Sequence, residues 1–503
     1  MTDIRAHFEE WEQEQEDMRC ETLEELLVLY RKWLYLEETE DIEITVAALL
    51  DRVIPGDPIW LQYIAPSGDK KTEILRSFSD YEKAYTIDTI TNKTLVSGLT
   101  KRNKDTGELE PAAGLLPQMN GKVLVIKDFS TTLSKSEEYR TELYGQLRNI
   151  YDGHFEAGFG TLPQKISMPS NIGLIAAATP VIDRYTRMEN SLGTRFLKVR
   201  SNTDPIKATK QALKNAENAE KMRYQLRGAV EYFTKSLKSR GVFEESNIPR
   251  LTQKQQDFII QLALYVAQMR ASVWAKFDSY GNIQTLESID VEKPTRVAKQ
   301  LMKTAQLLAI IRGHVKIEDT EIKTLQRLAK DTCEPTRQAI INAFWDRGKF
   351  DGSLSINDID GITKEKGKRI HYRTASNELE IMETLGIVDS VGNKIFKMTE
   401  EFKKTALYSM MYPFVTSEKK LKYGLFPEVT TGEIVGHPTL QEEAQLLYST
   451  IRKMQETEYR GPVPHEVVRE RIGWGEVKYS RIFGILKREG RAYEPRPGFV
   501  KVT

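Results

Sequence analysis

Residues 59 to 78, IWLQYIAPSGDKKTEILRSF, contain the pattern that decides the fold. Ile59 to Ile64 is an apolar run typical of a buried strand, a Pro-Ser-Gly turn follows it, and a helix is predicted to begin near Lys71 and Thr72. A strand, loop and helix in this order direct backbone N–H groups and a helix N-terminus at one point, which suits phosphate. A lysine adds a positive charge there, and a threonine hydroxyl can ligate Mg²⁺.

The loop departs from the usual phosphate-binding pattern, G-x-x-x-x-G-K-[ST], because both outer glycines are replaced. Its positions are Ala65, Pro66, Ser67, Gly68, Asp69, Lys70, Lys71 and Thr72. We interpret it as a modified P-loop for ATP, in which Lys71 contacts the β- and γ-phosphates and Thr72 binds Mg²⁺. Lys70 replaces the glycine that lets the backbone approach phosphate, and we expect its side chain to face solvent. The alternative is a lysine-rich turn before an amphipathic helix.

The composition excludes several classes of protein. The chain has 503 residues, which suggests roughly three domains. Its 73 Lys and Arg balance 72 Asp and Glu, so a case for nucleic acid must be local. Cys20 and Cys333 fit no metal or redox spacing, and without a signal peptide they predict a cytoplasmic setting. No apolar run reaches the roughly 20 residues of a membrane span, and no histidine pair has zinc-ligand spacing.

The pattern along the chain predicts several regions. Apolar strands alternate with helices from 43 to 205, which indicates a parallel α/β sheet with crossover helices. Long helical periodicity follows and predicts an all-helical unit. After it, helix, turn, helix and a two-stranded wing with Gly392-Asn393 at its turn indicate a winged helix, and the C-terminal residues repeat that plan. The predicted regions are an acidic N-terminal helical segment (1–42), the α/β core (43–205), a helical lid (206–335), a first winged helix (336–410), a linker (411–440) and a second winged helix (441–503).

The acidic N-terminal segment contains LEELLVLYRKWLYL (23–36), with apolar residues at helical spacing. Two interpretations are open. The helix packs against the next domain, or it is an arm that binds a partner.

Residues 97 to 133, SGLTKRNKDTGELEPAAGLLPQMNGKVLVIKDFSTTL, resemble the AAA+ core of the minichromosome-maintenance (MCM) helicases. In that family a "GLT…D..TGE…EAGAL" insertion forms a hairpin and leads into the strand "GVCLIDEF". The matching residues here are Gly98, Leu99, Thr100, Asp105, Thr106, Gly107, Glu108, Ala113, Gly114 and Leu115.

Later segments extend the resemblance over about residues 45 to 335. NIGLIAAATPVIDRY (171–185) is similar to the sensor-1 strand "VIAAANP…GRY", and SLGTRF (191–196) is similar to "LLSRF", which carries the arginine finger. PTRVAKQLMKTAQLLA (294–309) resembles the "PRTLEALIRLSEA" helix with the sensor-2 arginine. The nearest relatives by this resemblance are MCM-like ATPases of plasmids, viruses or mobile elements. The resemblance stops at the N-terminus, where MCM proteins carry a large collar domain.

The resemblance places Lys127 at the Walker-B aspartate and Asp128 at the catalytic glutamate. A lysine cannot hold the metal. Shifting the alignment by one residue would make Asp128 the metal ligand but would leave no catalytic base. The sequence therefore supplies one carboxylate for two roles, metal ligand and base. A third interpretation is that Asp128 only caps the strand end of an inactive fold.

The remaining catalytic residues are also implied by the resemblance. Thr179 stands at the sensor-1 position, where Asn is usual, and its hydroxyl can orient the attacking water. Arg195 would reach the γ-phosphate bound by a neighbouring subunit, which implies a ring, and Arg296 would lie over a nucleotide from the lid. The alternative for each arginine is a surface ion pair or a plain helix-face position.

The segment HFEAGFGTLPQKISMP (154–169) is predicted to be a strand, tip and strand, and the equivalent MCM hairpin projects a basic residue into the central channel. Lys165 is the candidate there, and Lys101, Arg102 and Lys104 lie on the other insertion. These residues would contact the backbone of single-stranded DNA, or they belong to solvated loops. The predicted winged helices add basic residues that would bind duplex DNA or a protein: Lys364, Lys366, Lys368, Arg369, Arg469, Arg471, Lys478, Arg481, Lys487 and Arg488.

Together these patterns predict an ATP- and Mg²⁺-dependent, ring-forming AAA+ motor on DNA, hexameric by the resemblance, and an MCM-like replicative helicase of a mobile element. Two alternatives are an ATP-dependent DNA-binding regulator or loader that does not unwind DNA, and an inactive ATPase fold retained as a scaffold.

Overall fold

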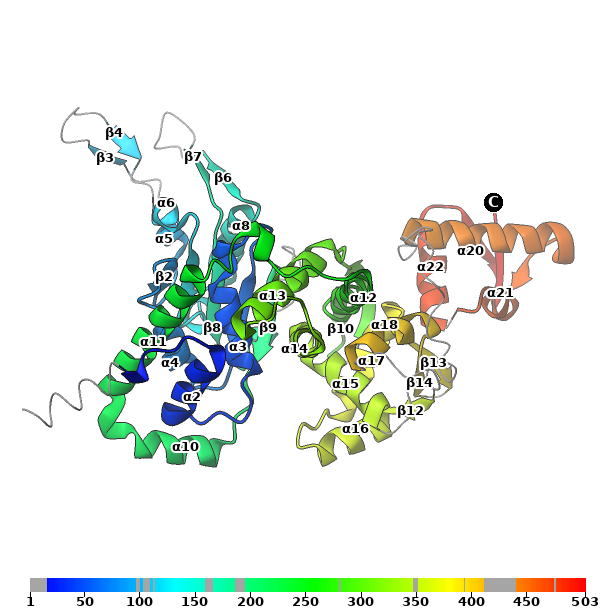
Figure 1. Cartoon of the computed structure of the whole chain (residues 1–503). Helices are drawn as coiled ribbons and strands as arrows, with labels where there is room; N and C mark the ends of the chain where they lie inside the picture. Colours follow the sequence, from blue (N-terminus) through cyan, green and yellow to red (C-terminus); the bar gives the residue numbers. More distant parts are fainter. Residues whose placement is uncertain are drawn as a thin grey trace, which may run out of the picture. The chain divides into compact units, whose positions relative to one another are not determined.

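The computed structural model describes residues 16–95, 100–102, 109–111, 114–158, 166–185, 195–279, 281, 283–346, 352–392, 394–410, 440–474 and 476–503 (Figure 1). These residues form two compact units. The first contains 16–276, 285–338 and 405–410, and the second contains 277–284, 339–404 and 440–503.

No helix within the described ranges has both the length and the apolar character needed to cross a membrane. Cys20 and Cys333 are buried free thiols.

A five-stranded parallel sheet forms the centre of the first unit and has the order β2-β5-β8-β1-β9. Its strands are β1 (Trp60–Ile64), β2 (Ala84–Ile87), β5 (Val123–Ile126), β8 (Gly173–Ala178) and β9 (Phe196–Arg200). The chain crosses from β1 to the edge strand β2, returns through β5 and β8, and then passes β1 to add β9. The α/β core with a parallel sheet, predicted from the alternating pattern, is therefore confirmed.

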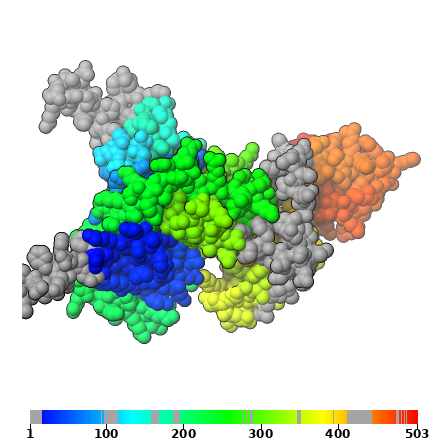
Figure 2. Space-filling model, in the orientation of Figure 1, coloured from blue at the N-terminus to red at the C-terminus, as the bar shows by residue number. Residues whose placement is uncertain are grey.

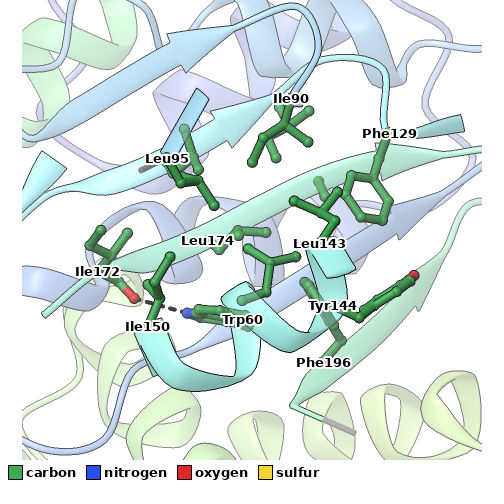
Figure 3. Packing of buried hydrophobic residues seen from close by; sticks show 14 of the residues in the cluster. Trp60, Ile90, Leu95, Phe129, Leu143, Tyr144, Ile150, Ile172, Leu174 and Phe196 are labelled. Carbon is green, nitrogen blue, oxygen red and sulfur yellow. Dashed lines mark hydrogen bonds between the residues drawn. The ribbon is translucent and has the colours of Figure 1, made fainter. Parts of the chain in front are cut away.

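One face of the sheet is covered by α8 (Glu137–Tyr151). Figure 3 shows Leu143, Tyr144 and Ile150 of this helix packed with Trp60 of β1, whose indole nitrogen donates to the carbonyl of Ile172 at 2.8 Å. Every residue of β1 is buried, as expected for a strand covered on both faces. The predicted strand at 60–64 is therefore an interior strand of the sheet, with β8 on one side and β9 on the other.

The other face is covered by α3 (Glu40–Leu49), because Tyr63, which alternates with the α8-facing Trp60 and Ile64, binds Asp41 of that helix. The preceding helix, α2 (Leu23–Trp33), starts with a capping box at Thr22 and packs on α11. Trp33 donates to Gln225 of α11 at 3.0 Å. In Figure 2 the blue N-terminal residues lie against green residues of the helical region. Of the two interpretations of the N-terminal segment, packing against the core is the one observed for residues 23–49.

Two small antiparallel sheets extend the core: β3 (Thr100–Arg102) with β4 (Leu109–Pro111), and β6 (His154–Ala157) with β7 (Ile166–Pro169). The predicted strand pair at 154–169 is therefore confirmed in its described residues. Figure 1 shows both sheets at the same end of the core. Short helices occupy the remaining connections: α4 (Lys71–Arg76), α5 (Asn92–Leu95), α6 (Leu116–Met119) and α7 (Ser130–Leu133).

The segment after β9 is mainly helical. Its long helices are α10 (Pro205–Lys214), α11 (Ala219–Ser239), α12 (Gln253–Met269), α13 (Thr295–Arg312) and α14 (Asp319–Thr332). The prediction of an all-helical unit is wrong, because β10 (Ser272–Phe277) and β11 (Ile283–Asp290) form a two-stranded sheet between α12 and α13. Gly281 lies between the two strands with φ +80°, a conformation that favours glycine.

The second unit contains two assemblies with the same order of elements, as the sequence repeat predicts. In each, a short strand is followed by two helices and two further strands. The three strands form a sheet, in the order β12-β14-β13 in the first assembly and β15-β17-β16 in the second. The first consists of β12 (Ser353–Ser355), α16 (Ile356–Glu365), α17 (Tyr372–Thr384), β13 (Val388–Gly392) and β14 (Ile395–Met398). The second consists of β15 (Val463–Pro464), α21 (His465–Ile472), α22 (Glu476–Arg488), β16 (Ala492–Arg496) and β17 (Phe499–Val502), with α20 (Leu440–Met454) before it.

Two further helices are α15 (Pro335–Asp346) and α18 (Glu400–Met410). Most of the predicted linker, residues 411–439, lies outside the described residues.

Candidate functional site

The C-terminal ends of β1, β8 and β5 lie next to one another at one edge of the sheet. Ile64 pairs with Ala178, and Ile126 pairs with Ala176. The backbone continues this alignment beyond the strands, because the N–H of Ala65 donates to Ala178 at 3.1 Å and the N–H of Phe129 donates to Ala177 at 2.8 Å. The predicted phosphate loop, the Lys127-Asp128 pair and Thr179 are therefore brought to the same edge. In open α/β sheets this edge is where ligands bind.

The predicted phosphate loop is an exposed turn followed by two buried lysines. Gly68 has φ +81°, which favours glycine, and the space where its side chain would be is open. The ammonium group of Lys71 donates to the carbonyl of Pro66 at 2.8 Å, so it folds back into the loop. Burial lowers the pKa of Lys71, while the charges of Asp69 and Asp128 act in the opposite direction. Lys71 is thus a cation held inside the loop, close to two carboxylates.

Lys70 does not face solvent, and that prediction is wrong. Its side chain is only 6% exposed and its ammonium lies 3.0 Å from Oδ2 of Asp41, which is 1% exposed. The hydroxyl of Tyr63 donates to the same carboxylate oxygen at 2.6 Å. The physical reason is that a buried carboxylate requires a counter-charge, and Lys70 is the cation that pairs with Asp41 here.

Asp128 is exposed and binds the first turn of α7. Its Oδ1 accepts the backbone N–H of Ser130 at 3.0 Å, and its Oδ2 accepts the hydroxyl of Thr131 at 2.6 Å. The preceding Lys127 forms an ion pair of 2.7 Å with Asp88, the residue after β2. Neighbouring side chains of the strand end thus have different partners: Lys127 pairs with Asp88, while the charge of Asp128 is one of those that act on the pKa of Lys71.

Thr179 and Ser130 connect the ends of β8 and β5. The backbone N–H of Thr179 donates to Oγ of Ser130 at 2.9 Å, and the two hydroxyl oxygens lie 3.3 Å apart. Thr179 is partly buried. Its hydroxyl therefore has a fixed place beside the segment that contains Asp128. Ser130 was not predicted as a site residue, although its place two residues after Asp128 is a signal that could have indicated it.

Arg195 and Arg296 are brought together, but at the opposite end of the sheet. The guanidinium of Arg195 lies 5.5 Å from the ring centre of Tyr151, and that of Arg296 lies 5.6 Å from the same ring. Arg195 directly precedes β9, whose first residue, Phe196, pairs with Trp60 at the start of β1. Because β1 runs about 16 Å from there to the loop, neither arginine is near Lys71.

A cavity of about 640 Å³ lies beside this arginine pair. Arg296 lines it together with Tyr151 and Asp152, and Lys299 and Glu292 contribute further charges. Arg195 is 8% exposed and lies 3.5 Å from Asp152. Burial, followed by the charge of Arg296, lowers the pKa of Arg195, as expected for two cations held close together. Tyr151, whose ring lies beside both guanidinium groups, belongs to no recognisable sequence motif.

The predicted DNA-binding residues are only partly described. Lys101 and Arg102 lie on β3, while Lys104 and Lys165 lie outside the described residues. In the second unit Arg481 lies on α22, and Lys487 of the same helix is 3.5 Å from Glu494.

Acidic neighbours neutralise several basic residues of the two helix–strand assemblies. Arg471 forms two hydrogen bonds with Glu458, at 2.8 and 2.9 Å, and Arg369 pairs with Asp360 at 2.6 Å. Lys366 forms an ion pair with Asp346. Lys364 and Lys368 are exposed. The positive surface is therefore weaker than the sequence suggests.

A resident metal site is absent from the described residues, in which no three His, Cys, Asp or Glu side chains gather in an arrangement that could hold a metal ion. A metal at this edge of the sheet would need ligands from a bound nucleotide, together with Thr72 and Asp128. No protein-family model matches this chain, and no curated protein matches it either.

Proposed function

We propose that the chain is an ATP-hydrolysing AAA+ motor that forms a ring and acts on DNA, most similar in plan to the MCM helicase core. One observation carries this proposal. Lys71, Asp128 and Thr179 lie at one end of the parallel sheet, while Arg195 and Arg296 lie at the other end beside the ring of Tyr151.

This separation favours catalysis shared between subunits. Arginines that stabilise the transferring phosphoryl group must contact it, and these two are separated from the loop of the same chain by the length of β1. They can act only on a nucleotide bound by another copy. A closed ring, hexameric by the resemblance, gives every loop such a partner.

The residues at the loop fit the phosphates of ATP. Lys71 is a buried cation that faces a loop carbonyl, the open side of Gly68 gives access to the backbone, and Asp128 and Thr179 lie beside them. With Asp128 as the base, Thr72 would hold Mg²⁺ together with the phosphates and water, and the ion would neutralise phosphate charge. Of the residues of this chain, Lys71 binds phosphate, Thr179 orients the attacking water, and Asp128 accepts a proton from that water.

Contact with DNA is supported by the two small sheets of the core, by the element order of the second unit and by the resemblance. The small sheets β3–β4 and β6–β7 lie at one end of the core, and by the resemblance β6–β7 would be the hairpin that projects a basic residue into the channel of MCM proteins. The two assemblies of the second unit have the order of elements of winged helices. Lys101, Arg102, Lys104 and Lys165 would contact the phosphates of a single strand, and Arg481 and Lys487 would contact duplex DNA.

A rate measurement tests the proposal. ATP hydrolysis is measured with and without single-stranded DNA, and the molecular mass is measured with Mg·ATP present. Turnover that rises with DNA in a particle of several subunits is expected. Displacement of an annealed strand then separates a helicase from a regulator or loader. A protein that stays monomeric and hydrolyses no ATP would contradict the proposal.

The second candidate, an inactive or weakly active ATPase scaffold, is favoured by the contacts of Asp128. Both carboxylate oxygens bind the start of α7, and Lys127 binds Asp88 instead of a metal. Nucleotide that is bound but not hydrolysed would support this candidate.

A further inference from the structure

A buried cluster connects the N-terminal helix α3 to the phosphate loop. Oδ2 of Asp41 accepts the hydroxyl of Tyr63 at 2.6 Å and lies 3.0 Å from the ammonium of Lys70. Oδ1 accepts the backbone N–H of Ile42 at 2.9 Å. The carboxylate is 1% exposed, so its partners are the groups of this cluster and water has almost no access. Tyr63 belongs to β1, which leads into the loop.

Lys70 is the last residue of the loop before α4. Its carbonyl accepts the N–H of Ile74 at 3.0 Å, which starts the helix, and its own N–H donates to Oδ1 of Asp69 at 2.7 Å. Fixing the side chain of Lys70 therefore fixes the backbone position from which Lys71 and Thr72 extend. The two lysines are directed to different partners, Lys70 to Asp41 and Lys71 to the carbonyl of Pro66.

The same helix makes a second buried ion pair that does not touch the loop. Glu43 lies 2.6 Å from Arg312 of α13, and the side chains are 9% and 12% exposed. Two acids of one helical turn are thus bound to different elements, one to the loop and one to the end of α13. This gives a natural control for any experiment on Asp41.

We propose that Asp41 is a positioning residue of the nucleotide site: it holds Lys70, and through it the loop, in the conformation that directs Lys71 at phosphate. This rests on the proposed function, because it assumes that the loop binds ATP. In a usual P-loop the residue at the position of Lys70 is a glycine, which has no side chain to anchor. Here an anchored side chain replaces the missing glycine, and the N-terminal helix becomes part of the nucleotide site.

The test compares Asp41→Asn, Lys70→Met, the double variant and Glu43→Gln. Asparagine keeps one acceptor oxygen, which can still serve Tyr63, but it removes the charge and replaces the oxygen that accepts the N–H of Ile42 by an amide donor. Glu43→Gln breaks the neighbouring ion pair. The affinity for Mg·ATP is measured by equilibrium binding, well below the melting temperature of every variant. Hydrogen exchange of the backbone amides of residues 67–72 is measured in the nucleotide-free proteins.

We expect Asp41→Asn and Lys70→Met each to weaken Mg·ATP binding by about ten-fold. The double variant should bind Mg·ATP as tightly as the single variant with the lower affinity, because both substitutions remove the same contact. Glu43→Gln should lower the melting temperature but bind Mg·ATP like the wild type. Exchange in the loop should be faster in Asp41→Asn and unchanged in Glu43→Gln.

Two results would overturn the inference: unchanged ATP affinity and loop exchange in Asp41→Asn, or an equal effect of Glu43→Gln. If the wild type binds no Mg·ATP, the proposed function fails, and loop exchange alone decides whether Asp41 holds the loop.

Discussion

The ammonium nitrogen of Lys303 lies 2.7 Å from Oδ1 of Asp51, and the two side chains are 2% and 0% exposed. Burial lowers the pKa of Lys303 from 10.5 to about 8, although the charge of Asp51 acts in the opposite direction. The lysine also donates to the carbonyl of Asp57 at 3.2 Å, just before β1. The folded protein therefore binds this proton less tightly than the unfolded chain does.

Stability should depend on pH through Lys303. Between about pH 8 and pH 10.5 the unfolded chain holds a proton that the folded protein has lost, so the free energy of unfolding should rise with pH by about 1 to 3 kcal/mol. Below this window the cost of burying the charge is fully present. The buried thiols of Cys20 and Cys333, whose pKa values are raised by burial, act in the opposite sense from about pH 9, and buried tyrosines such as Tyr151 do so at higher pH. Urea unfolding from about pH 7.5 to 9.5 measures the slope, and Lys303→Met should reduce it. Equal slopes would contradict the assignment to Lys303.

The two loop lysines should differ in their effect on nucleotide binding. Lys71→Ala removes the cation that faces the loop, and we expect a loss of Mg·ATP affinity of roughly 100-fold or more. Lys70→Ala removes only the anchor to Asp41, so its loss should be about ten-fold. Titration with a fluorescent ATP analogue compares them. A larger loss for Lys70→Ala would show that the register of the loop is wrong.

Arg195→Ala should retain nucleotide binding and lose turnover by a factor of about 10³ or more, because the arginine acts on the site of another subunit. Mixing this variant with Lys71→Ala should restore part of the activity, since some interfaces then combine an intact arginine with an intact loop. Lys299→Ala changes a residue that lines the neighbouring cavity and pairs with Asp57, so it is the control and should leave turnover unchanged. Arg195→Ala protein that hydrolyses ATP normally as a monomer would refute shared catalysis.

Asp128 can be tested with two substitutions that separate capping from chemistry. Asparagine caps helices as well as aspartate does, so Asp128→Asn should keep the stability, whereas Asp128→Ala should lose about 1 kcal/mol. If Asp128 accepts the proton of water, Asp128→Asn binds Mg·ATP normally and stops turnover. Weaker Mg²⁺-dependent binding would instead make Asp128 a metal ligand. Unchanged turnover in both variants would leave only the capping role.

The sequence was sufficient for the parts of the fold that depend on local pattern. The apolar runs of β1 and β8 are long enough to be recognised as buried strands, and parallel strands place their C-terminal ends together. For that reason the grouping of Lys71, Asp128 and Thr179 followed from the order of motifs along the chain.

The contacts that the sequence could not predict are those made between distant segments. Nothing near Asp41 indicates that its partner is Lys70, since the pairing depends on how α3 packs on the sheet. Likewise, Tyr151 holds Arg195 and Arg296 only because α8 ends beside the start of β9. The β10–β11 sheet was missed because its two strands, of 6 and 8 residues, stand between the long helical patterns of α12 and α13.

The position of β1 inside the sheet has a consequence for synthesis of the chain. Its partners are β8 and β9, and the residues that pair with Trp60 and Ile64 on β9 are Phe196 and Arg200. Roughly 130 residues must be translated after β1 before its last neighbour exists, which takes on the order of ten seconds at ribosomal speed. During that time the strand Trp-Leu-Gln-Tyr-Ile lacks a neighbour on at least one side, and an unpaired apolar strand of this kind favours aggregation of the nascent chain.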